Sequence, residues 1–348
     1  MLQALKQWVA PRLGIDLGTT TTLVYVPGKG VVVHEPSVVA LHEKERKVLA
    51  VGNEAREMLG KTPEDVVAYL PMREGVIADY RIAQVMLATY VRRALGSAAF
   101  IKPEVVVSVP AGVTTTQRRA VVEVVQQAGA RAAYVVREPI LAALGAGIPI
   151  HEPRGYIVAD IGGGTIDVAV ISLGGVVAAH SVKVGGVKLD TAITEYVRKQ
   201  HNLIIGQRMA EEIKMTIGTA LPLKKDETME VRGRDVVSGM PRAIDLSANE
   251  VAGALQRDLL AMVRAVRDVL NDTPPELASD IIDHGIALTG GTAQLRNLAE
   301  LLTRRIGVRT YVVDEPQQAV ARGCGVILQH LGTYKRLFAT KPGVSLGV

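Results

Sequence analysis

Residues 156–171 read YIVADIGGGTIDVAVI. Two apolar runs flank a short glycine turn, which predicts a β-hairpin. Three consecutive glycines are more than a hairpin needs, but they let backbone N–H groups converge on a bulky anion. Asp160 ends the first run beside that turn. A carboxylate next to an anion cradle suggests a phosphate group together with Mg²⁺, which prefers oxygen ligands.

The same pattern occurs earlier in the chain, where residues 13–25 read LGIDLGTTTTLVY. Asp16 takes the place of Asp160, 144 positions before it (160 − 16). Apolar runs that lead into glycine and then into a helical stretch also occur twice, at 105–112 and 286–291. A repeat this long indicates a duplicated domain. We therefore expect two similar α/β lobes whose Asp turns face one nucleotide in a cleft.

Composition narrows the class of protein. The 348 residues suffice for about two domains, and the net charge of +5 comes from interspersed Lys, Arg and acids rather than from a basic cluster. With 3% aromatic residues, stacking on bases is also poorly supported, so no nucleic-acid partner is expected. The single cysteine, Cys324, excludes an internal disulfide, fits a reducing cytosol and is expected to be a small core residue. The seven histidines show no zinc-ligand spacing.

Membrane segments are not expected within the chain. The longest uncharged apolar run, 168–182, is too short to span a bilayer, and the N-terminus lacks a signal-peptide pattern. Leu2, Leu5 and Trp8 nevertheless share one face of a short amphipathic segment, which could lie in a membrane interface. A flexible terminus, or a helix docked on its own domain, is the alternative. Phe100-Ile101 forms a second small apolar group, in a loop at 96–103.

Glu138 stands between a strand-like run, 134–136, and Pro139, which suits the first turn of a helix. This places Glu138 at the carboxyl end of a strand, where α/β sheets bind ligands. A surface ion pair with Arg137 explains the residue equally well.

Further along, Glu211 and Lys214 share one helix face, which by itself predicts an ordinary ion pair. A helix at 293–305 is expected to begin just after the glycines at 290–291, so that its N-terminus can receive a nucleotide. A helix at 114–128 is predicted with Thr114 as its N-cap and Gln117 completing a capping box.

Together these motifs resemble the actin-like ATPase superfamily, and within it the MreB/Mbl cell-shape proteins, over nearly the whole chain. The stretches that carry the resemblance are IDLGTTTTLVYVPGKGVVVHEPSVVA, REPILAALGAG, DIGGGTIDVAVISLGGVV, AEEIKMTIG and LTGGTAQL. Either glycine turn alone is a weak signal, but the paired occurrence is specific. The implied fold is actin-like, with two duplicated ribonuclease-H-like lobes around a nucleotide cleft, each lobe carrying a small inserted subdomain.

The resemblance implies ATP and Mg²⁺ as ligands and assigns site residues. Asp16 and Asp160 would flank Mg²⁺, mainly through water, and Glu138 would orient the attacking water with help from Thr165. Main-chain donors to the phosphates would come from Gly18, Thr19, Thr20, Thr21, Gly162, Gly163, Gly164 and Thr165. The adenosine would be bordered by Glu211, Glu212, Ile213 and Lys214, with Gly290, Gly291, Thr292 and Ala293 as the wall behind the nucleotide.

Three motifs depart from the usual family pattern, at five residues in all. Thr20-Thr21 replace Ala-Asn in the first turn, Ile166-Asp167 replace Thr-Glu after the second, and Thr292 replaces the third glycine of the wall. A side chain at 292 would crowd the nucleotide if its φ were positive. These departures bear on rate and affinity more than on the fold.

The expected organisation is an N-terminal amphipathic segment (1–12), lobe I (13–145, insertion about 34–66), lobe II (146–322, insertion about 183–246) and a C-terminal helix returning to lobe I (323–348). The implied function is an ATPase that polymerises with itself into filaments. These would lie in the cytoplasm against the inner membrane, through Leu2, Leu5, Trp8, Phe100 and Ile101, and would guide the cell-wall synthesis machinery. The alternatives are an actin-fold small-molecule kinase, with Asp167 as a conceivable base, and an ATP-binding scaffold with little turnover.

Overall fold

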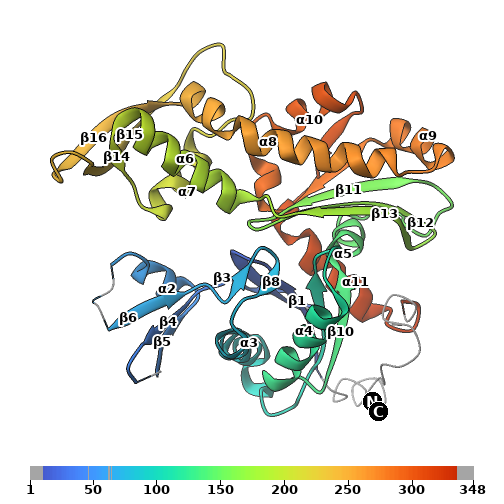
Figure 1. Cartoon of the computed structure of the whole chain (residues 1–348). Coiled ribbons are helices and arrows are strands. Elements are labelled where there is room, and N and C mark those ends of the chain that lie inside the picture. Colours follow the sequence, from blue (N-terminus) through green and yellow to red (C-terminus); the bar gives the residue numbers. More distant parts are fainter. Residues whose placement is uncertain (1–10, 46, 62, 64, 335–348) are drawn as a thin grey trace.

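The computed structural model describes residues 11–45, 47–61, 63 and 65–334. Lobe I is built on a five-stranded sheet in the order β10-β9-β1-β2-β3. Its strands are β1 (Arg12–Leu17), β2 (Thr21–Val26), β3 (Gly30–Pro36), β9 (Glu104–Val109) and β10 (Ala132–Arg137). The helices α3 (Tyr80–Leu95) and α4 (Thr115–Gln127) pack beside it (Figure 1). As predicted, α4 begins with a capping box of Thr114 and Gln117.

Lobe II repeats this plan with a sheet in the order β13-β12-β11-β17-β18. Its strands are β11 (Tyr156–Ile161), β12 (Ile166–Ser172), β13 (Gly175–Val182), β17 (Ile286–Thr289) and β18 (Thr310–Val312). The first three strands of each lobe are antiparallel neighbours, and the last two run parallel to the first. The helices α8 (Ala248–Asn271), α9 (Pro275–His284) and α10 (Leu298–Ile306) belong to this lobe. The predicted duplicated α/β fold is confirmed.

Burial explains why the hairpin at 156–171 is almost continuously apolar, with no alternation of apolar and polar residues. Every residue of β11 and all but the last of β12 are buried, because helices cover both faces of the lobe II sheet. A strand exposed on one face would instead alternate apolar and polar residues. Asp160 and Asp167 are thereby held within the buried hairpin itself.

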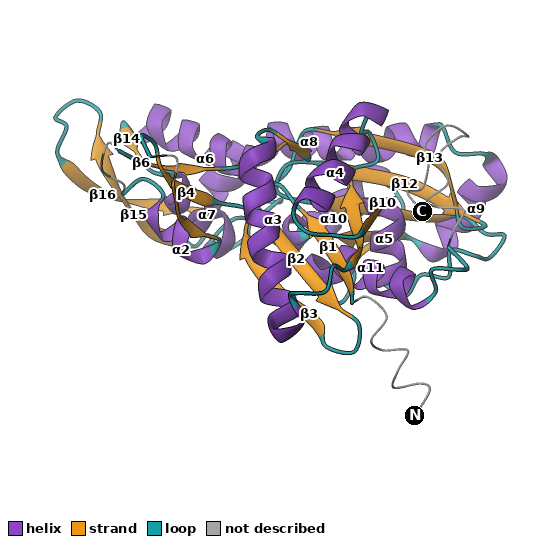
Figure 2. Cartoon of the chain, turned by 90° about the horizontal axis from the view of Figure 1, so that it is seen from below, coloured by secondary structure: helices purple, strands orange, loops and turns teal. Residues whose placement is uncertain are grey.

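Each lobe carries a small insertion, and both insertions lie at the same end of the molecule (Figures 1 and 2). That of lobe I contains β4 (Val39–His42), β5 (Lys47–Val51), α2 (Asn53–Met58) and β6 (Val66–Tyr69). That of lobe II contains α6 (Gly186–His201), β14 (Leu203–Ile204), α7 (Gln207–Thr216), β15 (Thr228–Asp235) and β16 (Pro241–Ser247). The first insertion's sheet runs to Tyr69, slightly past the expected boundary at 66. A two-stranded hairpin, β7 (Met72–Arg73) and β8 (Val76–Ile77), follows it, and a 3₁₀ turn at Gly96–Ala98 ends α3.

Two helices cross between the lobes (Figure 1). The helix α5 (Glu138–Gly145) follows β10 of lobe I but packs on β11 and β12 of lobe II. The helix α11 (Ala319–Gln329) follows lobe II but packs on β1, β2 and β9 of lobe I. It begins at Ala319, after a 3₁₀ turn at Pro316–Gln318. Cys324 is fully buried in the core shared by both lobes, as expected of a small packing residue.

The predicted helix at 293–305 is wrong in its first part. A 3₁₀ turn covers Gly291–Gln294, and α10 begins only at Leu298. Asn297 adopts a left-handed conformation with φ 62°, and Arg296 forms an isolated parallel bridge with Thr219. The chain is therefore drawn into a bridge with the loop after α7, and this interrupts the helix.

Candidate functional site

A cavity of about 530 Å³ lies between the two lobes. This volume is in the usual range for small-molecule and cofactor sites. Both Asp turns, the start of α5, the insertion helices α6 and α7, and the segment after β17 contribute to its lining. The residues predicted for the site that line it are Asp16, Gly18, Thr19, Thr20, Thr21, Glu138, Asp160, Gly162, Gly163, Gly164, Thr165, Glu211, Lys214, Gly290, Gly291 and Thr292.

In lobe I, three neighbouring parallel strands place polar groups at their carboxyl ends. Asp16 is on β1, Ser108 on β9, and Glu138 directly follows β10. The Ser108 hydroxyl lies 2.9 Å from Asp16 Oδ1 and 3.4 Å from Glu138 Oε1, while it accepts the Leu17 N–H at 3.1 Å. Ser108 thus connects the carboxylate expected near the metal to the one expected near the attacking water. Sequence reasoning missed it, although a lone hydroxyl in the run VVVSV was a visible signal.

Lobe II repeats the arrangement. Thr289 at the end of β17 donates a hydrogen bond of 2.7 Å from its hydroxyl to Asp160 Oδ1. Asp160 and Thr289 are partners in the parallel register of β11 and β17. Each lobe therefore has an Asp on its first strand that is oriented by a hydroxyl from the adjacent parallel strand. Thr289 was another residue that the sequence did not single out.

The acidic groups are buried close to one another. Burial raises the pKa of Asp16 to about 6 and that of Asp160 to about 7, against the effect of the Ser108 and Thr289 hydrogen bonds. Burial also raises the pKa of Glu138 well above its usual value, and the charges of Asp167, Asp16 and Asp160 raise it further. A cation between these groups would relieve the repulsion.

The donor set suits a cation that keeps much of its water. Among the described residues, no three carboxylate, histidine or cysteine side chains are grouped closely enough to hold a metal ion. Mg²⁺ commonly binds through one or two carboxylates, with water and phosphate oxygens as its other ligands. Asp16 and Asp160, one from each lobe, fit that pattern.

The two Asp turns face each other directly. A Cβ built on Gly163 would lie 2.9 Å from Thr20 Cβ, and one on Gly164 would lie 2.9 Å from Thr19 Cβ. Real Cβ atoms do not approach other carbons so closely, so only glycine fits at these two positions. The lobe II glycines thus let its turn come into contact with the lobe I threonines, and both turns line the cavity.

The adenosine side, as inferred from the resemblance, has different ion pairs from those predicted. Lys214 pairs with Asp190 of α6 at 2.8 Å and donates to Gly186 O at 3.2 Å, rather than pairing with Glu211. Glu211 instead pairs with Arg56, which lies on α2 of the lobe I insertion. The i, i+3 spacing was correct for one helix face, but the partners lie on elements that only the tertiary fold brings close.

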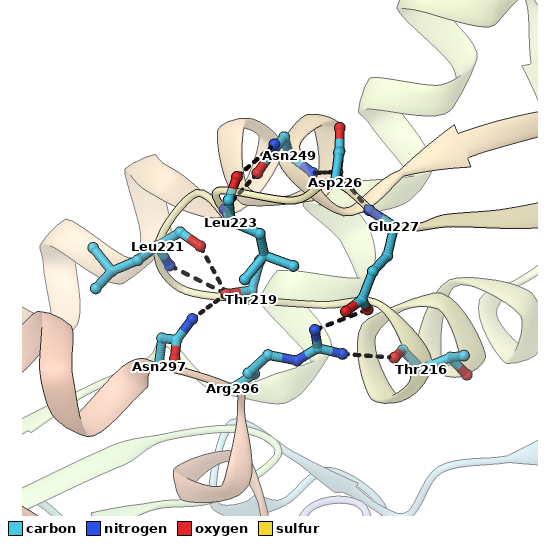
Figure 3. A network of polar contacts seen from close by, with 9 residues as sticks. All are labelled: Thr216, Thr219, Leu221, Leu223, Asp226, Glu227, Asn249, Arg296 and Asn297. Carbon is cyan, nitrogen blue, oxygen red and sulfur yellow. Dashed lines mark hydrogen bonds and ion pairs between the residues drawn. The ribbon is translucent and has the colours of Figure 1, made fainter.

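A polar network holds the wall next to this region (Figure 3). Arg296 donates to Glu227 at 2.9 Å and to Thr216 O at 3.3 Å, and Asn297 donates to the Thr219 hydroxyl at 3.0 Å. Asn249 at the start of α8 binds both the N–H and the carbonyl of Leu223. The loop between α7 and β15 is thereby tied to the segment between the 3₁₀ turn and α10. Arg296 itself lines the cavity.

Thr292 does not crowd the site in the way considered from the sequence. Its φ is not positive, whereas that of Gly290 is 85°. Its hydroxyl is buried and donates to Gly162 O at 2.8 Å, which connects the wall to the lobe II glycine turn. The departure from glycine therefore adds a cross-link within the site.

Several predicted residues lie elsewhere. Ile213 and Ala293 are buried in the lobe II core, and neither they nor the exposed Glu212 line the cavity. Asp167, considered from the sequence as a conceivable base, is fully buried and accepts the Ala111 N–H at 2.7 Å across the lobe boundary, which is a structural contact.

The two groups predicted to contact a membrane differ in what the structure says of them. Phe100 is 78% exposed and Ile101 is half-buried, while Leu2, Leu5 and Trp8 lie outside the described residues. No helix within the described ranges is both long and apolar enough to cross a membrane.

Comparison with known proteins agrees with this geometry. A sequence profile of the family described as MreB/Mbl protein matches residues 10–336. The chain is 46% identical to the cell shape-determining protein MreB of Escherichia coli K12 over 335 residues, covering 94% of this chain and 96% of that protein. It is 43% identical to the cell shape-determining protein Mbl of Bacillus subtilis 168 over 319 residues, covering 92% of this chain and 96% of that protein. The crystal structure of Spiroplasma citri MreB5 bound to ADP superposes with a TM-score of 0.89 at 35% identity, covering 94% of this chain and 98% of that one. The structure of MreB5 bound to AMPPNP gives the same values.

Proposed function

The chain belongs to the MreB/Mbl family of actin-like, cell shape-determining proteins, and from that premise we propose that it binds and hydrolyses ATP with Mg²⁺ and polymerises into membrane-associated filaments. The observation that carries the ATPase proposal is the pair of Asp turns that face each other across one cavity. Each turn follows a strand whose Asp carboxylate accepts a hydrogen bond from a hydroxyl of the neighbouring parallel strand. Phosphoryl transfer depends chiefly on such positioning and charge neutralisation.

We propose the following role for each group of residues. The threonine turn of lobe I and the glycine turn of lobe II would hold the phosphates, and Asp16 and Asp160 would hold the hydrated Mg²⁺, which neutralises phosphate charge when bound. Glu138, poised on the first turn of α5 and reached by Ser108, would orient the attacking water together with Thr165. Lys214 and Glu211 would border the adenosine, and Thr292 would stiffen the wall behind it.

Filament assembly is supported by the two ends of lobe II. The turn between β15 and β16 exposes Val236, Val237 and Met240, and arginines at 232, 234 and 242 surround it. The far end exposes Leu173 and, on α9, Ile282 between acidic residues. Figure 1 shows that β15–β16 and α9 lie at opposite ends of lobe II. Exposed apolar side chains at opposite ends of one lobe favour a head-to-tail contact that does not close on itself.

Membrane attachment would use the exposed Phe100 together with the N-terminal Leu2, Leu5 and Trp8. One such group binds a bilayer weakly, but repetition along a polymer adds avidity. The filaments would then lie in the cytoplasm on the inner membrane, where they could engage the cell-wall synthesis machinery.

The testing experiment is sedimentation of the purified protein with ATP and Mg²⁺, with and without anionic liposomes, alongside phosphate release. Pelleting that requires nucleotide and rises with liposomes is expected. Val237→Glu should lose pelleting but keep nucleotide binding, and Phe100→Ser should weaken only the liposome-dependent part of the pelleting. ATP binding without phosphate release would instead identify a scaffold, and release without polymer a soluble actin-fold enzyme such as a kinase.

A further inference from the structure

Two ion pairs join the lobes across the cleft. Arg56 on α2 of lobe I pairs with Glu211 on α7 of lobe II. Lys183, just after β13 of lobe II, pairs with Glu74 in the β7–β8 turn of lobe I at 3.0 Å. Every other ion pair found among the described residues lies within one lobe or at the end of α11.

These two pairs stand at different sides of the nucleotide cavity. Glu211 lines the cavity beside Lys214 and Asp190, the side assigned to the adenosine. At the other side, Gly75 lines the cavity next to Glu74, and its N–H donates to the Thr19 hydroxyl at 2.9 Å. A Cβ on Gly75 would also lie 3.2 Å from Thr165 Cγ2, so the β7–β8 turn touches the phosphate hairpin of lobe II.

Glu74 and Gly75 form the two-residue turn of the β7–β8 hairpin, a turn type that requires positive φ at both residues. Glu74 has φ 50° and Gly75 has φ 78°, so two consecutive residues adopt the left-handed region. A non-glycine residue there is uncommon and costs conformational energy, which the surrounding contacts must offset. Lys183 is the first contributor to lowering the pKa of Glu74, which agrees with a charged contact between them.

The lobes are joined permanently elsewhere. At the crossing, α5 and α11 pack closely together, and the Ala111 N–H of lobe I donates a hydrogen bond to the buried Asp167 carboxylate of lobe II. The two ion pairs differ from these buried contacts because their side chains are partly exposed to solvent. The exposed fractions are 43% for Arg56 and 32% for Glu211, and 68% for Lys183 and 37% for Glu74. Exposed ion pairs are weak and screened by salt, so they can break and re-form.

We propose that Arg56 and Lys183 are gate residues, whose ion pairs with Glu211 and Glu74 hold the lobes closed over bound nucleotide and slow its release. The inference rests on the proposed nucleotide site and adds its regulation. It assigns a role to Arg56 and Lys183, which lie outside the cavity lining, in the reaction cycle of the site.

The test is the release rate of a fluorescent ADP analogue from the full chain with Mg²⁺, measured by displacement with excess ATP. Arg56→Gln and Lys183→Gln remove a charge at similar side-chain length. Each variant is expected to accelerate nucleotide release about two- to five-fold, which corresponds to the free energy that an exposed ion pair typically contributes. Lys44→Gln is the matched control, because Lys44 forms an exposed pair with Asp65 inside lobe I, and its release rate should equal that of the wild type.

Two further measurements separate a gate from a general structural defect. Arg56→Lys and the charge-swapped pair Glu74→Lys with Lys183→Glu should restore most of the wild-type rate. Raising the salt concentration should accelerate release from the wild type more than from the Arg56→Gln, Lys183→Gln double variant. Unchanged release in both single variants, or equal acceleration by Lys44→Gln, would overturn the proposal. A wild type that binds no nucleotide would instead refute the proposed function.

Discussion

Gly323 is a position where one added methyl group has a predictable effect on the stability of this fold. It lies in α11 at the crossing with α5, and a Cβ there would clash with Leu141 O and would lie 2.6 Å from Leu141 C and 2.8 Å from Leu141 Cα. Carbon atoms in contact are normally about 3.5 Å apart, so Gly323→Ala must push the helices apart by about 1 Å. The obstacle is backbone, which cannot rotate away as a side chain does. Overpacking of this kind costs about 3 kcal/mol, and the better helix propensity of Ala returns about 1 kcal/mol.

We therefore expect Gly323→Ala to lower the free energy of unfolding by about 2 kcal/mol, measured by urea denaturation and by Tm. Gly253→Ala is the matched control, because Gly253 is exposed in α8 and its Cβ would meet nothing within 4 Å. That variant should gain about 1 kcal/mol from helix propensity alone. The difference of about 3 kcal/mol between the two variants isolates the clash, since the chemical change is the same. Equal stabilities for the two variants would refute the close crossing.

Three further outcomes follow from the site. Glu138→Ala should leave nucleotide binding nearly intact and slow phosphate release about 100-fold or more; unchanged release in a single-turnover assay would remove Glu138 from the mechanism. Thr292→Val loses the hydrogen bond from the Thr292 hydroxyl to Gly162 O, so the free energy of ATP binding should weaken by about 1 kcal/mol. A titration should then show a Kd for ATP that is raised several-fold. Asp160, with a pKa raised to about 7, retains a proton that the unfolded chain releases near pH 4. Stability of the nucleotide-free protein should therefore fall as pH rises from 4 to 7, and Asp160→Asn should flatten that profile of Tm against pH.

The duplicated lobes could be predicted because their signals are local. A strand, an Asp, a glycine turn and a second strand occupy adjacent residues, and the repeat appears twice at fixed spacing. The capping box of Thr114 and the strand-to-helix junction at Glu138 are likewise set by neighbours in sequence. Such features need no knowledge of the tertiary fold, and the structure places them where the sequence predicted.

The partners of charged and polar side chains could not be predicted in the same way. Glu211 pairs with Arg56, 155 positions away, although Lys214 lies on the same helix face. Ser108 reaches Asp16 because β9 happens to be the neighbour of β1. The helix expected at 293 is interrupted because Arg296 bridges to Thr219 on another loop. In each case the deciding contact is between segments far apart in the chain, and periodicity carries no information about it.

The crossing of α5 and α11 also links lobe movement to the position of Glu138. Glu138 is the first residue of α5, directly after β10 of lobe I, yet α5 packs on β11 and β12 of lobe II. At the other end of α5, a Cβ on Gly145 would lie 2.7 Å from Ala319 C, so that end is fixed against α11. Glu138 is thus held by lobe I through β10 and by lobe II through the packing of α5, so a change in the angle between the lobes has to be absorbed at this residue. In the proposed mechanism, closure of the cleft would therefore also adjust the group that orients the attacking water.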